Sequence, residues 1–187
     1  MNLSNNLNYR AYGQERMLKI IEAVKYLRYL SAKDIGDLFF DISNFSSTEI
    51  RNRKTQQILN TLVKTKKLNR YFEYDKNFNC FVYYPYGKRL TKYCTHGAYC
   101  SRIYTVLSTR LPSWLKIEEF KLEYDFLGLT KPDIYCVIKN VATGVSKIFL
   151  IEVDLDNVKQ RTLSKYATDD GKEVQQFCEK PTGFIVV

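Results

Sequence analysis

Three carboxylates near the ends of two apolar segments have the chemistry of a metal site. Asp133 follows Pro132 and opens one segment, whereas Glu152 and Asp154 end the next one. Residues two apart in a strand point to the same side, so we expect Glu152 and Asp154 to share a face that Asp133 can approach. Carboxylate oxygens suit Mg²⁺, and a bound metal can activate water against a phosphodiester. Asp133, Glu152 and Asp154 are therefore candidate catalytic residues, and the first two are candidate metal ligands.

Basic and amide side chains lie along a predicted helix that begins after Ser46 and runs to about Lys66. Successive residues of an α-helix are rotated by about 100° about its axis. If Ile58 and Leu62 face the core, this rotation determines which residues lie on the opposite face. That opposite face carries Arg53, Gln57, Asn60 and Lys64, with Gln56 at its edge. Arginine pairs with guanine, and glutamine or asparagine with adenine, in the major groove of DNA. A lysine at the far end of the helix suits a phosphate contact instead.

Basic residues surround this helix without an acidic one among them. Residues 51–70 include seven lysines and arginines and no aspartate or glutamate. The charge and the helix together predict DNA binding, although a polar face opposite a core stripe is also what any solvated surface helix has. The candidate DNA-binding residues are Arg51, Arg53, Lys54, Gln56, Gln57, Asn60, Lys64, Lys67, Arg70 and Lys76.

Aromatic residues are unusually frequent, with 15 Tyr and 11 Phe in the chain. Six of them follow the basic helix on two short segments, namely Tyr71, Phe72, Tyr74, Phe81, Tyr83 and Tyr84. Such rings can stack on bases, but they are more often cross-strand pairs and core. The sequence leaves both interpretations open.

The cysteines and the single histidine give weaker signals. The five cysteines form no CxxC pair and are odd in number, which predicts free thiols in a reducing cytoplasm. Cys94, His96 and Cys100 lack a fourth ligand for structural zinc. His96 is interpreted either as a proton-transfer group or, preferably, as a buttress of the helix that it starts. No apolar run approaches the roughly 18 residues of a membrane span, so no membrane partner is expected.

The elements that must position these side chains follow from capping patterns and periodicity. Ser31 followed by Asp34, and Ser46 followed by Glu49, predict two helix starts. Aromatic-rich segments around an Asn-containing turn predict a hairpin. The expected elements are helices at 9–30, 32–40 and 46–66 and hairpin strands at 70–75 and 80–84. Three helices and a hairpin in this order are typical of a winged helix-turn-helix, whose third helix enters the major groove.

A different order of elements is predicted for the second half. Periodicity predicts a helix at 93–111, strands at 117–126, 133–139 and 147–153, a helix at 157–168 and a last strand at 183–187. The predicted strand at 147–153 is almost continuously apolar, as in a strand buried on both faces. We therefore expect an α+β protein with a DNA-binding domain at 1–90 and an α-β-β-β-α-β domain at 91–187. The chain stops in the last strand, which is also typical of a truncated sequence.

The net charge is divided unevenly between these two halves. Residues 1–92 hold 17 basic and 8 acidic residues, whereas residues 93–187 hold 12 of each, so the first half accounts for the whole +9. An anionic partner such as double-stranded DNA is thus expected for the first half. The apolar content of 45% is enough for a core and argues against disorder.

The order of the second half, with Pro-Asp and then Glu-x-Asp, resembles the PD-(D/E)xK nuclease core. Asp154 stands where the lysine of that pattern is expected. Over about residues 15–187, the chain resembles the replication-relaxation family of plasmids and phages, which joins a winged helix to a nuclease-like domain. The matching residues are Lys92 to His96, Ile103 with Tyr104, Pro132 with Asp133, Phe149 to Asp154, and Lys165 with Tyr166.

The resemblance implies a DNA-binding accessory protein in plasmid or phage replication, DNA relaxation or conjugative mobilisation. A relaxase or replication initiator is then an expected partner, and a homodimer is compatible with it. The alternative is a metal-dependent nuclease that the winged helix targets, with Mg²⁺ as cofactor. Lys165 or Lys159, on the following predicted helix, would then supply the missing cation. We favour an inactive scaffold, in which the acids pair with Lys165 or Arg161.

Overall fold

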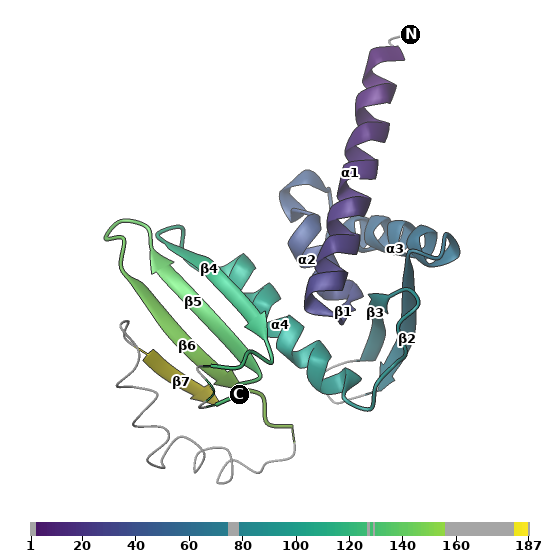
Figure 1. Ribbon diagram of the computed structural model, residues 1–187. Coiled ribbons are helices and arrows are strands. Elements are labelled where there is room, and N and C mark those ends of the chain that lie inside the picture. Colours follow the sequence, from purple (N-terminus) through teal and green to yellow (C-terminus); the bar gives the residue numbers. More distant parts are fainter. Residues whose placement is uncertain (1–2, 75–78, 127, 129, 156–181, 187) are drawn as a thin grey trace. The chain divides into compact units, whose positions relative to one another are not determined.

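The computed structural model describes residues 3–74, 79–126, 128, 130–155 and 182–186. This part of the chain is a mixed α+β structure with two small sheets (Figure 1). It divides into two compact units, Met1–Thr105 and Val106–Val187. The division falls within the helix that follows the hairpin, whereas the sequence suggested a division near residue 90. Among the described helices, none is long and apolar enough to span a membrane.

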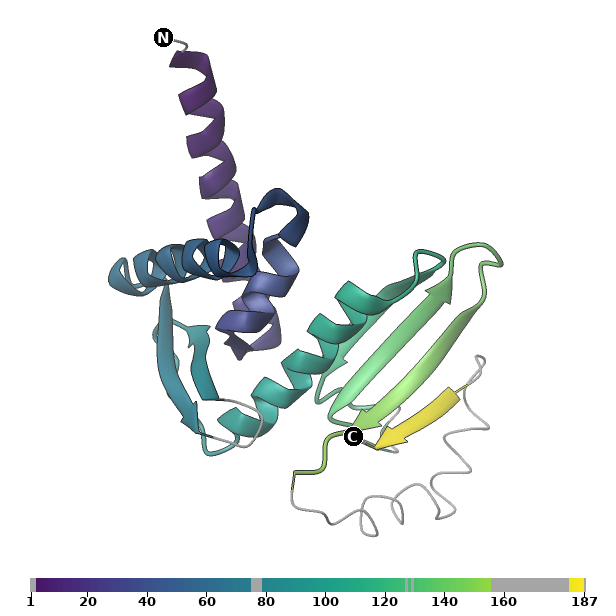
Figure 2. The same ribbon diagram turned by 180° about the vertical axis from the view of Figure 1, so that it is seen from behind.

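The first unit contains three helices, a hairpin and the start of a fourth helix. Its elements are α1 (Leu3–Leu27), β1 (Leu30–Ser31), α2 (Ala32–Phe39), the 3₁₀ turn η1 (Ile42–Asn44), α3 (Thr48–Lys64), β2 (Leu68–Tyr74), β3 (Asn79–Pro85) and α4 (Cys94–Arg110). Its antiparallel sheet has the order β1-β3-β2, which leaves β2 at one edge. The predicted hairpin is confirmed, and α3 runs crosswise to α1 in both views (Figures 1 and 2).

The junction between α1 and α2 differs from the predicted one at the end of α1. The helix ends at Leu27 rather than Leu30, because Arg28 adopts a left-handed conformation with φ of 68°. Leu30 and Ser31 then pair with β3 as a two-residue strand. The predicted cap is confirmed, since the Ser31 hydroxyl accepts from the Asp34 amide at 3.0 Å and the Asp34 carboxylate accepts from the Ser31 amide.

The start of α3 is displaced by one residue from the prediction. The N-cap is Ser47 rather than Ser46, and its hydroxyl accepts from the Ile50 amide at 3.3 Å. A hydrogen bond from Ser47 also lowers the pKa of the Glu49 carboxyl. The prediction was wrong because two consecutive serines precede the helix, and the spacing to Glu49 selected the earlier one. The helix also ends at Lys64, two residues before the predicted end.

The first turns of α4 pack against the rest of the first unit. The Ser101 hydroxyl donates at 2.8 Å to the Leu27 carbonyl at the end of α1, which also accepts from the Tyr29 amide at 2.9 Å. Arg102 Nη1 donates to the fully buried Asp34 carboxylate at 2.6 Å. Gly97 lies so close to Tyr29 that a Cβ would come within 2.5 Å of its ring. These contacts join residues that lie on either side of the predicted domain division.

The second unit is built on a four-stranded sheet. Its strands are β4 (Leu115–Leu122), β5 (Ile134–Asn140), β6 (Ser146–Glu152) and β7 (Thr182–Val186). The order is β4-β5-β6-β7, with antiparallel pairing except between β6 and β7, which are parallel. β4 starts and ends earlier than the predicted strand, and Glu123, with φ of 50°, follows its end. The predicted helix at 157–168 lies outside the described residues.

Candidate nucleic-acid interface

The buried stripe of α3 fixes which side chains of this helix face outward. Thr55, Leu59 and Leu62 are at most 2% exposed, whereas Ile58, which the sequence placed in the core, is half-buried. The stripe is thus centred on Leu59 and includes Leu62 but not Ile58. The opposite side still carries the predicted polar residues. Arg53, Gln57 and Lys64 are all exposed there, and Asn60 is half-buried.

A hydrogen-bond network connects α3 to the hairpin at the edge of this face. Gln56 Nε2 donates to the Tyr83 hydroxyl oxygen at 3.0 Å and to Asn60 Oδ1 at 3.2 Å. Arg70 Nη1 donates to the same Asn60 oxygen at 2.9 Å, and its guanidinium lies 4.4 Å from the centroid of the Phe81 ring. The Asn60 oxygen already accepts two bonds, so Asn60 cannot offer adenine its full donor and acceptor pair without breaking them. Among the predicted base readers, Arg53 and Gln57 extend from the face most openly.

The remaining predicted DNA-binding residues fall into two groups. Arg51 pairs with Asp37 of α2 at 3.0 Å, and its side chain is 13% exposed, so it holds α3 against α2. Lys54, Lys67 and Arg70 are exposed. Lys76 lies outside the described residues.

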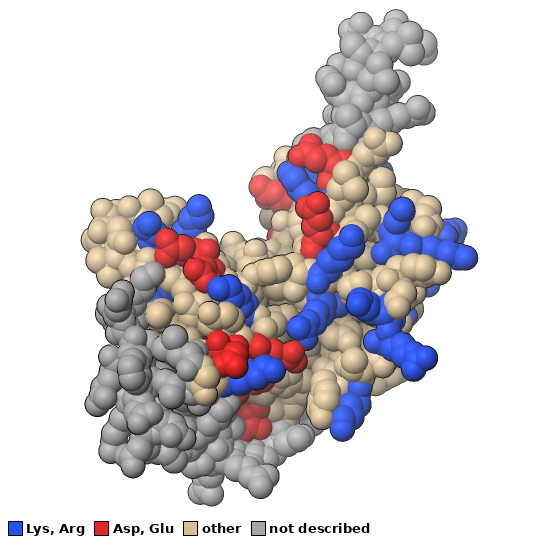
Figure 3. Space-filling model, in the orientation of Figure 1, with Lys and Arg blue, Asp and Glu red and all other residues tan. Residues whose placement is uncertain are grey.

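The charged side chains of the first unit are unevenly distributed over the face that Figure 3 shows. Lysine and arginine gather where α3 and β2 lie, whereas both signs occur over α1 and α2. A single-signed patch raises the local concentration of an anionic ligand. The outward face of α3 therefore lies within a positively charged surface.

The two faces of the hairpin use their aromatic residues differently. On one face, Tyr71 and Tyr84 pack against Tyr29, with ring centroids 6.5 and 6.3 Å from it. Burial raises the pKa of the Tyr71 hydroxyl, as do neighbouring Cys94 and Glu73. On the other face, Phe72 and Tyr74 are 42% and 83% exposed. Strand alternation could have separated these two sets, had the register of β2 been known.

The acidic residues of the second unit lie where β5 begins and β6 ends. Ile134 and Ile151 form the last pair in the register of β5 and β6. Asp133 directly precedes Ile134 and Glu152 directly follows Ile151, so the two acids lie at the same end of this strand pair. Asp133 Oδ2 accepts from the Val153 amide at 2.8 Å, and Glu152 is 7% exposed.

The described surroundings of these acids are those of a strand end. Asp154 lies two residues after Glu152, the last residue of β6, and is therefore outside the strand. No group of three or more histidine, cysteine or acidic side chains that could hold a metal occurs in the described ranges. Lys165, Lys159 and Arg161 lie outside those ranges. Since Mg²⁺ is often held by only one or two carboxylates together with waters and substrate phosphates, Asp133 and Glu152 stay candidate metal ligands.

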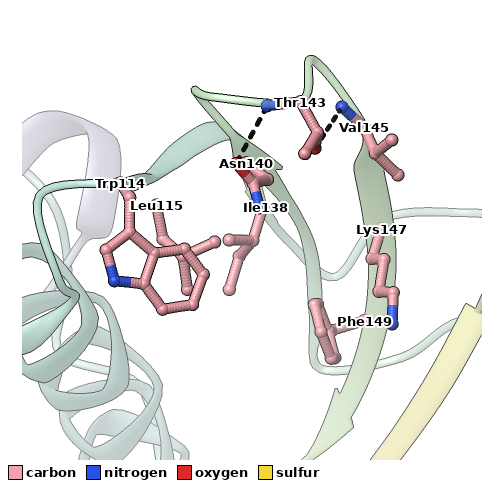
Figure 4. A pocket seen from close by; sticks show the side chains of 8 residues that line it. All are labelled: Trp114, Leu115, Ile138, Asn140, Thr143, Val145, Lys147 and Phe149. Carbon is pink, nitrogen blue, oxygen red and sulfur yellow. Dashed lines mark hydrogen bonds between the residues drawn. The ribbon is translucent and has the colours of Figure 1, made fainter.

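An apolar recess lies on one face of the second sheet (Figure 4). It has a volume of about 460 Å³, and its lining residues include the apolar Trp114, Ile138, Val145 and Phe149. Lys147 also lines it. No local sequence pattern indicates this recess, because its lining residues come from three strands and the turns beside them.

The thiols and the histidine show no built site. Cys80, Cys94, Cys100 and Cys136 are not in disulfides, as predicted, and Cys178 lies outside the described residues. Burial raises the pKa of Cys136 to about 12. His96 Nδ1 lies 3.8 Å from Cys100 Sγ within the first turns of α4.

Comparisons with protein-family models, with curated proteins and with solved structures find no match to the chain. The resemblance to the replication-relaxation family therefore stays a prediction from the sequence.

Proposed function

We propose that the first unit binds double-stranded DNA as a winged helix-turn-helix. In this proposal, α3 enters the major groove and the β2–β3 hairpin is the wing beside it. The observation that carries the proposal is the outward face of α3. Arg53, Gln57 and Lys64 are exposed there, opposite the buried stripe that anchors the helix.

Each of these three side chains has a role that follows from its chemistry. Arg53 can donate two parallel hydrogen bonds to the O6 and N7 atoms of guanine, and Gln57 can pair with the N6 and N7 atoms of adenine. They lie four residues apart and therefore on the same side of the helix. Lys64, at the end of α3, supplies a point charge for a phosphate and carries no sequence information.

The test is the DNA affinity of three α3 variants at several salt concentrations. Arg53→Ala and Gln57→Ala should relax the preference for particular bases, each costing about 1–3 kcal/mol at the cognate site. Lys64→Ala should weaken binding to all DNA sequences alike. It should also reduce the slope of log affinity against log salt concentration by about one. Lys25→Ala is a matched control, since Lys25 is an exposed lysine on α1. No binding to duplex DNA at low salt by the unmodified chain would overturn the proposal.

We further propose that this binding serves plasmid or phage DNA replication, DNA relaxation or conjugative mobilisation. The support is the resemblance of the chain to the replication-relaxation family, which spans both predicted domains. A relaxase or a replication initiator is then the expected partner, and the protein is expected in the cytoplasm, either alone or as a homodimer. A relaxase or replication gene beside the coding sequence would support this context. Copurification with the encoded enzyme would test it directly.

The alternative function is that of a metal-dependent nuclease, and one observation favours it. Asp133 and Glu152 flank Ile134 and Ile151, the last pair in the register of β5 and β6. Incubation of supercoiled plasmid with Mg²⁺ or Mn²⁺ separates the two functions. Nicking that disappears in Asp133→Ala and in Glu152→Ala would establish the nuclease. Binding without nicking in either metal would support the accessory role.

A further inference from the structure

The outer face of the hairpin bears a continuous strip of aromatic side chains that the duplex contact proposed above does not use. Phe72 and Phe81 are cross-strand partners whose rings meet edge to face at 5.1 Å. Tyr74 lies two residues further along β2, with its ring 4.8 Å from that of Phe72. We define this aromatic strip as Phe72, Tyr74 and Phe81.

The strip is exposed to water to an unusual degree for its composition. Tyr74 is 83% exposed and Phe72 is 42% exposed, and they lie on the edge strand of the sheet. The rings on the opposite face of the same hairpin instead contact Tyr29. Phe81 is half-buried, so the two rings of β2 are the exposed part of the strip. An exposed apolar cluster of this kind marks an interaction site.

The strip also adjoins the basic face of α3. Arg70 precedes Phe72 by two residues on the same side of β2, and its guanidinium lies over the Phe81 ring at 4.4 Å. The same arginine donates to Asn60 of α3. The strip is thus continuous with the proposed duplex-binding face, and a cation is fixed where the two meet.

We propose that the aromatic strip stacks on unpaired bases of DNA next to the duplex that α3 contacts. The inference rests on the proposed function and specifies its substrate as DNA with a melted or single-stranded segment. Phe72 and Phe81 have no donor for a phosphate oxygen, so contact with an intact backbone would leave their rings unused. Base faces in a duplex are covered by neighbouring base pairs, whereas unpaired bases stack on aromatic side chains.

The test compares two labelled DNAs of the same sequence, a fully paired duplex and one with a central stretch of mismatches. The protein should bind the mismatched DNA about ten-fold more tightly, since one base stacked on an aromatic ring contributes that much. Phe72→Ala and Tyr74→Leu should remove the preference and leave duplex affinity unchanged. Tyr74→Phe should keep it, because the ring remains.

The controls separate a failure of this inference from a failure of DNA binding. Tyr26→Ala removes an exposed tyrosine of α1 and should change neither affinity. Equal binding of both DNAs by the unmodified protein, or an equal loss on both in the strip variants, would overturn the inference and leave duplex binding standing. Absence of binding to either DNA would overturn the proposed function itself. Thermal unfolding of each variant shows whether it has folded.

Discussion

The two sides of the first unit use polar and aromatic residues for opposite purposes. On the side that faces α4, Asp34 is fully buried and bonded to Arg102, and Tyr29 packs against Tyr71 and Tyr84. On the side formed by α3 and the outer hairpin face, side chains of the same kinds extend into water. The difference indicates that the inner side stabilises the fold and that the outer side is available to a ligand. Substitutions on the two sides should therefore separate unfolding from binding.

The largest effect on stability is expected at Asp34. Asp34→Ala removes the carboxylate that completes the cap of α2 and leaves Arg102, which is 28% exposed, without this partner. Loss of a charge-assisted hydrogen bond and of a cap should lower the free energy of unfolding by about 3 kcal/mol. Denaturant unfolding measures this loss.

A matched control for this variant is Asp41→Ala. Asp41 also caps a helical turn, but it is exposed, and its carboxylate accepts from the Ser43 amide at 2.9 Å. A surface cap of this kind should contribute about 1 kcal/mol or less. Equal losses in the two variants would show that burial and Arg102 add nothing to the role of Asp34.

A smaller loss is expected at Gly97. Gly97→Ala places a methyl group 2.5 Å from the Tyr29 ring, so that either α4 or the aromatic cluster must move. Overpacking should cost about 1–3 kcal/mol, from which the better helix propensity of alanine subtracts up to about 1 kcal/mol. An increase in melting temperature would contradict the close packing. Gly13→Ala in α1 is a control, because nothing lies within 4 Å of its added Cβ.

The smallest effect on stability is expected on the outer side. Arg53→Ala should change the free energy of unfolding by less than about 0.5 kcal/mol, because an exposed side chain opposite the core is replaced by a good helix former. Its DNA affinity should fall nonetheless. A variant that lost stability in proportion to affinity would contradict the separation between the two sides.

Local signals predicted the elements of the first unit well. The Ser31 cap, the hairpin and the order of helices depend on residues that are close in the chain, and the structure has all of them. The cap of α3 was placed one residue early because Ser46 and Ser47 satisfy almost the same pattern. The inward stripe of α3 includes Thr55, which is buried although a threonine does not mark a core face in the sequence.

Contacts between distant residues were beyond the reach of these signals. Nothing in the sequence pairs Asp34 with Arg102, which lie 68 residues apart, or places Gly97 against Tyr29. The outer and inner aromatic residues of the hairpin could be separated only once the register of β2 with β3 was known. Asp133 and Glu152 were expected to meet. They flank Ile134 and Ile151, the last pair in the register of β5 and β6, and the hydrogen bond from the Val153 amide to Asp133 was not anticipated.

Ser31 gives the first unit a property that no single element has. The backbone of Ser31 pairs with that of Val82 in β3, and its side chain caps α2. Asp34, which completes this cap, also bonds to Arg102 of α4. The β2–β3 hairpin cannot detach from β1 at this point without releasing the start of α2. We therefore expect the amides of β3 and α2 to exchange with solvent deuterium at similar rates, as parts of one cooperative unfolding unit. The hairpin would then be held in a fixed position before any ligand binds.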